Sequence, residues 1–504
     1  MPFPYSDLRE YLAEIDAAGE LIRIKAEVSS ELEITEITDR VSKSLGSENK
    51  ALLFENVLGY EIPVLINLMG SHKRLEMGLG VGHNSRGYDA IGERIRSLIK
   101  PELPFTLKDK IDKLLELSEL RHIIPKKVSK AACQEVVILA ENSHSVKGKE
   151  GQKLLDKLPI LKCWPEDGGP FITLTSVFTK DPDKLGAGRN VGMYRLQKFN
   201  DITTGMHWHK HHDGASNYSK TLKQGKRMEM AITIGNDPVI PYCATAPLPP
   251  GIDEMLLAGF IRNKPVELVK CKTIDIEVPA SSEIVLEGYI DLSEDLVTEG
   301  PFGDHTGFYS LADLYPKFHL TALTHRKDPI YVTTIVGIPP QEDCYLGKAT
   351  ERIFLPLLQL VCPEILDMSL PWEGVFHNCA LIRIKKKYAG HAFKIMNTIW
   401  GTGQLAWTKY VIVFDEDVDI QNYSLAAMHA LGNTDPQRDF LFSKGPLDIL
   451  DHASQIQGFG SKVGIDATRK WEGEGFKREW PDLITMSTET KELVNSKWNQ
   501  YFTS

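Results

Sequence analysis

The middle of the chain is a long succession of short β-like runs, which Gly, Pro, Asn and Asp separate from one another between Cys133 and Leu323. Five of these runs are FITLTSVF, MEMAITIG, PVELVKC, EIVLEGYI and KFHLTAL. Short runs that stop at turn residues indicate strands joined by tight connections. The pattern therefore predicts a largely antiparallel sheet or a small barrel at the centre of the molecule.

The residues before this stretch predict an α/β unit. An amphipathic helix is expected to follow Ser6, a candidate N-cap, and to end at Gly19. Its apolar stripe is Leu8, Tyr11, Leu12 and Ile15. The strand-like runs LIRI, ALLFENV and PVLINL follow, with helical stretches between them. The unit is expected to end in the charged, proline-bearing region 100–127.

After the central stretch, strand and helix patterns alternate again. The strand candidates are YVTTIVG, ALIRIKK and YVIVFDED, and helical patterns cover 349–361 and 390–404. This alternation predicts a second α/β domain. In the tail 488–502, apolar residues recur at roughly helical spacing, namely Leu493, Val494, Trp498 and Tyr501. A short terminal helix with such a stripe has to pack on its own chain or on a neighbouring subunit.

Length and composition limit the class of protein. A chain of 504 residues exceeds what one hydrophobic core usually holds, so several domains are expected. With 42% hydrophobic and 25% charged residues it is an ordinary soluble, globular chain rather than a disordered one. The net charge of −10 argues against a general binder of nucleic acids or anionic membranes.

The chain start and the cysteines bear on location. The first residues, MPFPYSDLREY, lack the layout of a secretory signal, and no apolar run approaches the roughly 20 residues of a membrane span. The seven cysteines are scattered and contain no CxxC pair, which indicates reduced, mostly buried thiols. We therefore expect a cytoplasmic protein, for which peripheral membrane contact stays open.

Four histidines occur within six residues in the segment HWHKHHDG, which spans 207–214. If this segment is a strand, His207, His209 and His211 share one face. A polar strip that faces solvent explains the pattern equally well. A structural zinc site is less well supported because no cysteine pair accompanies the cluster, whereas imidazole with oxygen ligands suits Mg²⁺ or Mn²⁺.

Two carboxylates flank a predicted turn in TEGPFGDHTG. Glu299 and Asp304 stand on either side of Gly-Pro-Phe-Gly, whose composition favours a turn over a continuing strand. Two close carboxylates resist joint ionisation, but an Arg between them would keep one charged and leave the other as a general acid. Upstream, Asn190 and Arg195 lie in GRNVGMYRLQ. The alternative interpretation of the two carboxylates is a helix N-cap or a surface ion pair. For Asn190 and Arg195 the alternatives are a turn and an Arg on a surface strand.

Other sequence signals for chemistry are weak. The Gly-rich segments 78–82 and 458–464 match neither the phosphate-binding loop nor the dinucleotide fingerprint. No GxSxG nucleophile motif is present. Glu254 stands where a helix begins, so its simplest role is to complement the helix dipole.

Taken in order, the motifs of the chain resemble those of the UbiD family of decarboxylases that use prenylated FMN. The segments that carry the resemblance are LEITEITDR, ALLFENV, CWPED, NVGMYR, HWHKHHDG, ATAPLPP, EVPASSEIVLEGYI, EGPFGDHTGFY and GIDAT. They are spread over nearly the whole chain, so the match is more specific than any single motif. The chain is similar to the quinone-pathway members, which act on polyprenyl hydroxybenzoates or dihydroxynaphthoates.

The resemblance implies a fold of mixed α/β and α+β domains. It places an N-terminal α/β domain at 1–127 and a flavin-reductase-like split β-barrel, which binds the cofactor, at 128–324. A C-terminal α/β domain would cover 325–470, and a tail with a terminal helix 471–504.

The resemblance also assigns binding residues. The family's metal ligands fall on Asn190, His211 and Glu254, and the metal is Mn²⁺ or Mg²⁺, with K⁺ or Na⁺ as an additional cation. The flavin-binding residues it implies are Asn190, Met193, Tyr194, Arg195, His207, Trp208, His209, Lys210, His211, His212 and Asp213. Related enzymes often have Arg-Gly where this chain has His212–Asp213, which puts those two contacts in doubt.

The catalytic set that the resemblance implies is Arg195, Glu299 and Asp304. Arg195 would hold the substrate carboxylate, Glu299 would tune Arg195, and Asp304 would donate the proton that replaces carbon dioxide. The shorter side chain at Asp304, where some members have Glu, matches the quinone-pathway type.

The function implied is non-oxidative, in principle reversible, decarboxylation of an aromatic acid of ubiquinone or menaquinone biosynthesis. A flavin prenyltransferase would supply the cofactor, and the enzyme would be a homo-oligomer, either a dimer or a hexamer. Two alternatives stay open: an enzyme that acts on small phenolic or other aromatic acids, and a non-catalytic flavin- or metal-binding subunit of a carboxylase complex.

Overall fold

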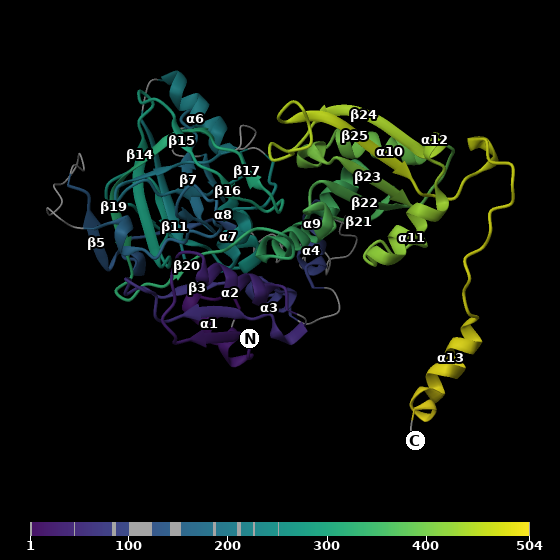
Figure 1. The fold of residues 1–504 in the computed structure, drawn as a ribbon, viewed down its shortest axis with the longest axis horizontal. Helices are drawn as coiled ribbons and strands as arrows, with labels where there is room; N and C mark the ends of the chain where they lie inside the picture. The colour runs from purple at the N-terminus through teal and green to yellow at the C-terminus, as the bar shows by residue number, and fades with distance from the viewer. Residues whose placement is uncertain are drawn as a thin grey trace, which may run out of the picture.

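The computed structural model describes residues 3–44, 46–82, 87–99, 123–141, 153–184, 188–208, 213–224, 227–249 and 251–502. In Figure 1 the N-terminal part lies against the central part, and the C-terminal part stands to one side. The last residues run away from all three parts as an arm that ends in a helix. Residues 100–122, most of the region expected to close the N-terminal unit, lie outside the described residues.

The first helix, α1 (Leu8–Ala17), confirms the predicted amphipathic stripe. Leu8, Tyr11, Leu12 and Ile15 are all buried, and each such side chain stabilises the fold by about 1.5–3 kcal/mol. The N-cap is Asp7 rather than Ser6, so that prediction was wrong by one residue. The Asp7 carboxylate accepts hydrogen bonds from the backbone N–H groups of Arg9 and Glu10, because a carboxylate can accept two such bonds.

The N-terminal sheet contains the predicted strands. Its described order is β1 (Leu21–Ile24), β2 (Ala51–Phe54), β3 (Val64–Ile66) and β20 (Tyr331–Val332). The helices α2 (Glu33–Ser42) and α3 (His72–Gly78) belong to the same unit. Strand β20, expected within the region after the central stretch, pairs in parallel with β3 instead. The chain therefore returns to the N-terminal sheet before it enters the C-terminal part.

The central β-rich stretch is confirmed as a sheet. The described strands β10 (Thr203–Gly205), β19 (Lys317–His325), β14 (Ile284–Ile290), β11 (Met228–Ile234), β7 (Ser176–Lys180) and β8 (Arg189–Gly192) follow one another in that order, and β5 (Val136–Leu139) also pairs with β19. Every pairing is antiparallel. Within the described residues β10 and β8 do not pair, so the strands form no closed barrel.

Gly288 shows why one position of this sheet requires glycine. The pairing of β14 with β19 shifts register between Glu287 and Gly288. A Cβ atom at Gly288 would lie 2.0 Å from the carbonyl oxygen of His319, which no backbone could tolerate without moving.

The C-terminal part is a five-stranded mixed sheet of described strands. Their order is β21 (Ile365–Ser369), β22 (Cys379–Ile384), β23 (Tyr410–Phe414), β25 (Phe459–Asp466) and β24 (Phe440–Pro446). The predicted helical patterns correspond to α9 (Glu342–Val361) and α10 (His391–Trp400). Helix α9 packs beside α4 (Asp89–Ile99), and Arg352 joins the two through a 2.8 Å hydrogen bond to Asp89. The mixed α/β multidomain class is confirmed.

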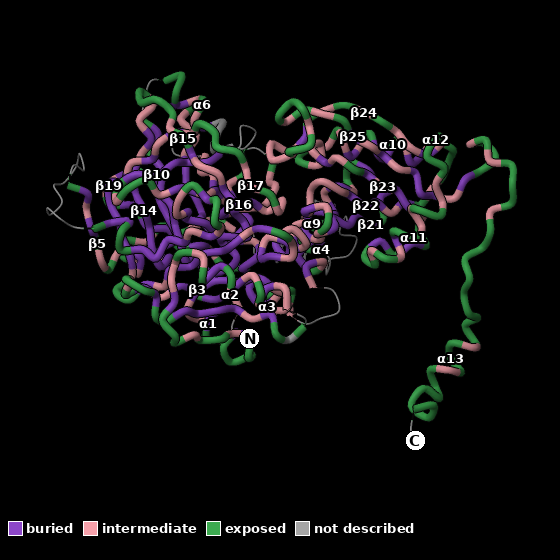
Figure 2. Tube along the Cα trace, in the orientation of Figure 1, coloured by how far each residue is buried: buried purple, intermediate pink, exposed green. Residues whose placement is uncertain are grey.

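Burial differs sharply between the body and the arm, as Figure 2 shows. The helix α13 (Thr488–Lys497) has no buried residue. Of its predicted apolar stripe, Leu493, Trp498 and Tyr501 are each more than half exposed within the part of the chain that the structure describes. No helix within the described ranges has both the length and the apolar character that crossing a bilayer requires. All seven cysteines are described, and none of them forms a disulfide.

Candidate active site

Three short strands bring the predicted catalytic residues together. Arg195 directly precedes β9 (Leu196–Gln197), and Glu299 ends β15 (Val297–Glu299). Asp304 directly follows β16 (Phe302–Gly303). The Gly and Pro content of 300–303 predicted a turn there, but that prediction was wrong: Phe302 and Gly303 pair with β17 (Tyr309–Ser310) as β16, and the turn follows Asp304. Gly300 lies so close to Gly168 that neither position has room for a Cβ atom.

Arg195 bridges the two carboxylates. Its Nε and Nη2 donate to Glu299 Oε1 at 3.0 and 2.9 Å, and its Nη1 donates to Asp304 Oδ2. The side chains of Arg195, Glu299 and Asp304 are only 9%, 1% and 7% exposed. The guanidinium also lies 4.4 Å above the ring of Phe302 and donates to Ser310 Oγ at 3.0 Å. The predicted arrangement, with an Arg between the two acids, is present in this geometry.

Three histidines extend this cluster, and the sequence indicated only His207 as part of it. His207 Nδ1 lies 2.9 Å from Glu299 Oε1. His305 makes two hydrogen bonds to Asp304 Oδ1. Its backbone N–H donates at 2.8 Å, and its side-chain Nδ1 lies 2.9 Å from the same oxygen. His305 Nε2 in turn lies 2.9 Å from His377 Nε2. His305 stands next to Asp304 in the sequence, whereas no sequence pattern pointed to His377.

The charges of the cluster determine its protonation. Burial alone would raise the pKa of Asp304, but the Arg195 charge and the bonds from His305 hold that pKa far below its usual range. Burial would lower the pKa of His305, yet its bond to Asp304 and the carboxylate charge raise that pKa to about 9. Burial and the Arg195 charge lower the pKa of His207. At neutral pH Asp304 is therefore ionised and His305 is protonated, while His207 is neutral.

A cavity of about 200 Å³ lies beside this cluster. Arg195, Asp304, His207 and His305 form part of its wall, so both the cation and the acid face the cavity. The apolar part of the wall comprises Leu174, Met193, Phe302, Val336 and Leu450. A cavity with a few convergent polar groups on an apolar lining is the usual form of a small-molecule site.

A second cavity, of about 640 Å³, adjoins the first. We call the first the inner cavity and the second the outer cavity. The two share His207 and Leu450. The outer cavity lies between the segment that follows Asp304 and the loop before β25 of the C-terminal part. Its apolar lining residues are Phe308, Leu311, Ala312, Ile449 and Leu450. The outer cavity extends the inner one away from the acid cluster.

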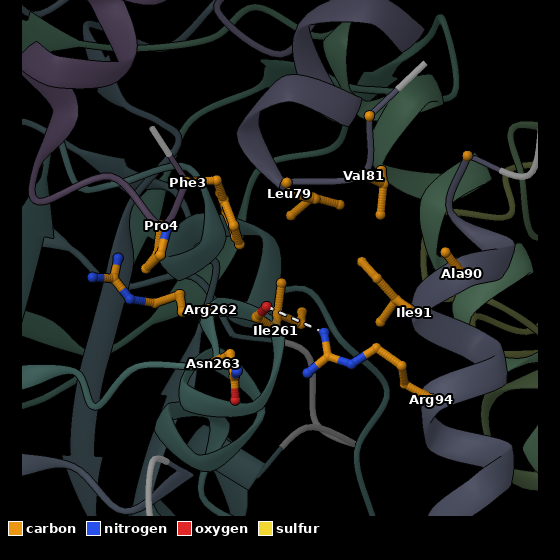
Figure 3. A pocket seen from close by; sticks show the side chains of 13 residues that line it. Phe3, Pro4, Leu79, Val81, Ala90, Ile91, Arg94, Ile261, Arg262 and Asn263 are labelled. Atoms are coloured by element: carbon orange, nitrogen blue, oxygen red, sulfur yellow. Dashed lines mark hydrogen bonds between the residues drawn. The ribbon is translucent and has the colours of Figure 1, made fainter. Parts of the chain in front are cut away.

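Figure 3 shows a third cavity, of about 450 Å³, near the start of the chain. Leu79, Val81 and Ile91 line it, and Arg94 donates to the carbonyl oxygen of Ile261 at 3.4 Å. Its described lining includes neither an Asp nor a Glu, and none of the predicted site residues. The acid cluster therefore belongs to the inner cavity.

Two of the three predicted metal ligands meet. Asn190 on β8 donates from Nδ2 to Glu254 Oε1 at 3.2 Å, and the backbone N–H of Val191 donates to Glu254 Oε2 at 2.7 Å. Glu254 begins α8 (Glu254–Arg262) and is buried. The buried Asn190 Oδ1 has no hydrogen-bond partner among the described residues, and an orphaned carbonyl oxygen beside a carboxylate fits a hard cation. The third ligand, His211, lies outside the described residues.

Some of the predicted flavin-binding residues are among the described residues, and others are not. Met193, Tyr194, Arg195 and His207 line the inner cavity. Trp208 is buried, and its ring meets that of Tyr194 edge-on at 5.8 Å. Asp213 begins α6 (Asp213–Gln224). The predicted contacts His209, Lys210, His211 and His212 lie outside the described residues.

Comparison with protein families identifies the class of protein. Three models of 3-octaprenyl-4-hydroxybenzoate carboxy-lyase domains match in chain order: the N-terminal domain over residues 12–95, the Rift-related domain over 126–339 and the C-terminal domain over 344–467. The chain is therefore a carboxy-lyase by family. The chain belongs to the UbiD family.

Relatives and solved structures agree with this assignment. An uncharacterized protein of Aquifex aeolicus (strain VF5) is 50% identical over 99% of both chains. The closed form of vanillic acid decarboxylase from Sedimentibacter hydroxybenzoicus is similar with a TM-score of 0.84 and 28% identity over 99% of both chains. The UbiD-class enzyme HmfF from Pelotomaculum thermopropionicum, solved with FMN, is similar with a TM-score of 0.77 and 28% identity over 96% of this chain and 98% of its own. An evolved dimeric form of HmfF was solved with prFMN.

Proposed function

We propose that this carboxy-lyase removes carbon dioxide from an aromatic acid with prenylated FMN as its cofactor. The observation that carries the proposal is that Arg195 bridges Glu299 and Asp304 where Arg195 and Asp304 line a cavity. Bound prenylated FMN would supply an electron sink next to the ring carbon that loses its carboxylate. A subunit that only binds flavin or metal has no use for such an acid cluster.

Each residue of the cluster has a distinct task in this proposal. Arg195 faces the cavity, so its guanidinium can bind the substrate carboxylate. Glu299 holds Arg195 in place through two hydrogen bonds to one oxygen. Asp304 is ionised in the free enzyme, so in this proposal it gains a proton in the substrate complex and donates that proton to the ring carbon when carbon dioxide leaves. His207 supports Glu299 through a contact of Nδ1 with the same carboxylate oxygen.

The cofactor would be anchored through a divalent metal. Asn190 and Glu254, with His211, would ligate Mn²⁺ or Mg²⁺, and K⁺ or Na⁺ would assist. The orphaned Asn190 Oδ1 and the buried Glu254 support this assignment. Met193, Tyr194, Arg195, His207 and Trp208 would contact the flavin, together with His209, Lys210, His211, His212 and Asp213. The flavin-bound structures of HmfF support the choice of cofactor.

The substrate we propose is a hydroxybenzoate or hydroxynaphthoate intermediate of ubiquinone or menaquinone biosynthesis. The outer cavity supports the choice of a substrate whose ring carries an apolar substituent. Phe308, Leu311 and Ile449 line this cavity, so an apolar chain on the ring could extend into it. The alternative substrate is a small phenolic acid, which the inner cavity alone would accommodate.

The experiment is a substrate series tested on enzyme co-produced with a flavin prenyltransferase and verified to carry the cofactor. The series comprises 4-hydroxybenzoate, its 3-alkenyl derivatives of increasing chain length, and dihydroxynaphthoates. We expect kcat/KM to rise with chain length until the outer cavity is filled. A preference for the unsubstituted acid would favour the small phenolic substrate. A loaded enzyme that is inert toward every aromatic acid would overturn the proposed function.

Replacing Glu254 by Gln is expected to weaken metal binding by on the order of 100-fold, because the amide keeps the hydrogen bond to Val191 but loses the charge. Metal content and flavin absorbance of the purified protein measure this loss, and circular dichroism reports the fold. The matched control is Glu267→Gln, which removes an exposed carboxylate on β12 (Glu267–Lys270). Full flavin and metal content in Glu254→Gln would remove Glu254 from the ligand set.

We also propose that the terminal arm joins copies of this chain into a homo-oligomer. The arm exposes Ile484, Met486, Leu493, Trp498, Tyr501 and Phe502. Such a concentration of apolar side chains on one segment marks an interaction surface. We expect Leu493→Ser with Trp498→Ser to lower the mass measured by light scattering, whereas Lys491→Gln on the same helix leaves it unchanged. An unaltered mass in the double variant would exclude the arm from assembly.

The remaining parts of the proposal concern supply and location. A flavin prenyltransferase would deliver the cofactor, and the free, mostly buried thiols support action in the reducing cytoplasm. We keep 1–127, 128–324, 325–470 and 471–504 as the proposed divisions of the chain.

A further inference from the structure

The proposed reaction consumes a proton that Asp304 does not hold in the free enzyme. Loss of carbon dioxide from a carboxylate leaves an electron pair on the ring carbon, so each turnover takes one proton from solution. Arg195 and His305 both donate to the Asp304 carboxylate, and each of these bonds favours its charged form. Asp304 therefore gains its proton only once the substrate has arrived.

The surroundings of Asp304 differ in their access to solvent. On the side of His305, Nε2 of that ring lies 2.9 Å from His377 Nε2, but the other ring nitrogen of His377 is buried and has no hydrogen-bond partner among the described residues. On the opposite route, the inner cavity adjoins the outer one, and the outer lining residue Leu311 is 88% exposed. The proton therefore reaches Asp304 through the cavities, by the route that the substrate takes.

Arg195 has one N–H group left for a ligand. Of its five N–H groups, Nε and one on Nη2 donate to Glu299, the second on Nη2 donates to Ser310 Oγ, and one on Nη1 donates to Asp304 Oδ2. The second N–H group of Nη1 has no acceptor among the described residues. Because Arg195 lines the inner cavity, a substrate carboxylate bound there would share Nη1 with Asp304.

The charges around Nη1 disfavour a second ionised carboxylate. Arg195 and His305 carry positive charges, and the carboxylates of Glu299 and Asp304 already balance them. Burial raises the pKa of Asp343 to about 6, so this residue adds a further negative charge at neutral pH. Two close carboxylates on one donor resist joint ionisation, and the substrate carboxylate with Asp304 would form such a pair. The pair is therefore expected to take up one proton.

We propose that the aromatic acid binds together with one proton, which Asp304 Oδ2 takes up as the substrate carboxylate joins it on Arg195 Nη1; this inference rests on the proposed function. The two hydrogen bonds from His305 to Oδ1 hold the Asp304 side chain in place while Oδ2 carries the proton. The bond between the ring and the carboxylate then breaks, carbon dioxide leaves, and the ring carbon takes the proton of Oδ2 with the electron pair of the broken bond. One carboxylate and one proton thus become one arene and one carbon dioxide, and Asp304 returns ionised to Arg195.

The proposal gives the affinity for the acid a definite dependence on pH. A complex that holds one proton more than the free enzyme weakens as the pH rises, so Kd is expected to rise about tenfold per pH unit. Tyr315, with a pKa of about 12, and His305, with a pKa of about 9, keep their charge states between pH 6 and 7.5. Asp343 titrates near this range, and a control variant must therefore test it. The charged and titratable groups that face Asp304 and His305 are Arg195, His207, Tyr315, Asp343, His377 and Asp448.

The first test measures proton uptake without turnover. Protein loaded with FMN in place of prenylated FMN is titrated with 4-hydroxybenzoate by calorimetry at pH 7, in buffers of different ionisation enthalpy. We expect about one proton to be taken up per acid bound, and Kd to rise about tenfold per pH unit between pH 6 and 7.5. The matched ligand is 4-hydroxybenzamide, which carries no charge and should bind without proton uptake and with a constant Kd. Binding of the acid without proton uptake would overturn the proposal.

The second test identifies the group that takes the proton. In Asp304→Asn the uptake should fall to near zero and Kd should no longer depend on pH, whereas Asp343→Asn, the matched control on α9, should keep both. The infrared difference spectrum of acid binding should show a newly protonated carboxyl group in the wild-type protein and none in Asp304→Asn. Proton uptake that persists in Asp304→Asn would assign the proton to another group and sink the proposal.

Failure of this inference is distinguishable from failure of the proposed function. If the acid binds with its proton but enzyme loaded with prenylated FMN releases no carbon dioxide from any acid of the series, the coupling stands and the proposed function falls. If the loaded enzyme turns over and the acid binds without a proton, the proposed function stands and the coupling falls.

Discussion

Replacing Asp304 by Asn is expected to lower kcat by about 10²- to 10⁴-fold, the contribution typical of a general acid. The Asn side chain keeps the size of Asp but has one acceptor oxygen in place of two. In the native protein Arg195 donates to one carboxylate oxygen and His305 to the other, so the new amide N–H group must face a donor on one side. The variant therefore loses both the acid and one of its hydrogen bonds.

Cofactor binding in Asp304→Asn is expected to remain intact, because the proposed metal ligands Asn190 and Glu254 are joined by contacts that do not involve Asp304. Flavin absorbance checks this point, and steady-state release of carbon dioxide gives kcat. The matched control is Asp295→Asn, which removes an exposed carboxylate and should leave kcat within twofold. Full activity in Asp304→Asn would show that another group donates the proton.

Arg195→Met is expected to abolish turnover and to destabilise the protein by about 3–5 kcal/mol at pH 7, because two buried carboxylates lose their shared cation. The expected loss of kcat/KM is 10³-fold or more, since the same guanidinium is proposed to bind the substrate carboxylate. Arg195→Lys should be more stable than Arg195→Met, but a point charge cannot donate to Glu299 and Asp304 in the arrangement of a planar guanidinium. Urea denaturation at pH 7 measures the stability of each variant.

The pH dependence of this destabilisation has a definite sign. Arg195 lowers the pKa of Asp304 in the folded protein, so its stabilisation is present above the ordinary pKa of 3.8 and is lost as the pH falls. Without Arg195, the effect of burial in raising the pKa of Asp304 is no longer opposed by that charge. Lowering the pH then protonates Asp304 and removes the buried charge that destabilises the variant. The stability difference between wild type and Arg195→Met should therefore shrink from pH 7 to pH 5. Adding Glu299→Gln to Arg195→Met should recover part of the lost stability, and a further loss would contradict the proposed charge balance.

The strands of this protein follow directly from local sequence patterns. The runs MEMAITIG, EIVLEGYI and KFHLTAL became β11, β14 and β19, because β-branched and apolar residues bounded by turn residues pack well in a sheet wherever it forms. The helix α1 also follows from its local sequence, and only its N-cap, Asp7, differs from the predicted Ser6. Pairing between distant segments was not local. Strand β20 joined the N-terminal sheet because Tyr331 lies beside Val64, which no short-range pattern encodes.

The amino-acid pattern by itself determined that the strand of Glu299 ends before Gly300, because Gly and Pro disfavour a continuing strand. It also indicated, through the order of its motifs, that Arg195 belongs with Glu299 and Asp304. Only the tertiary structure decided that one guanidinium bridges both acids and that His377, 73 residues beyond Asp304 in the sequence, completes the chain of hydrogen bonds behind it. Hydrogen bonds depend on positions in space, and the folding of separate parts onto one another sets those positions.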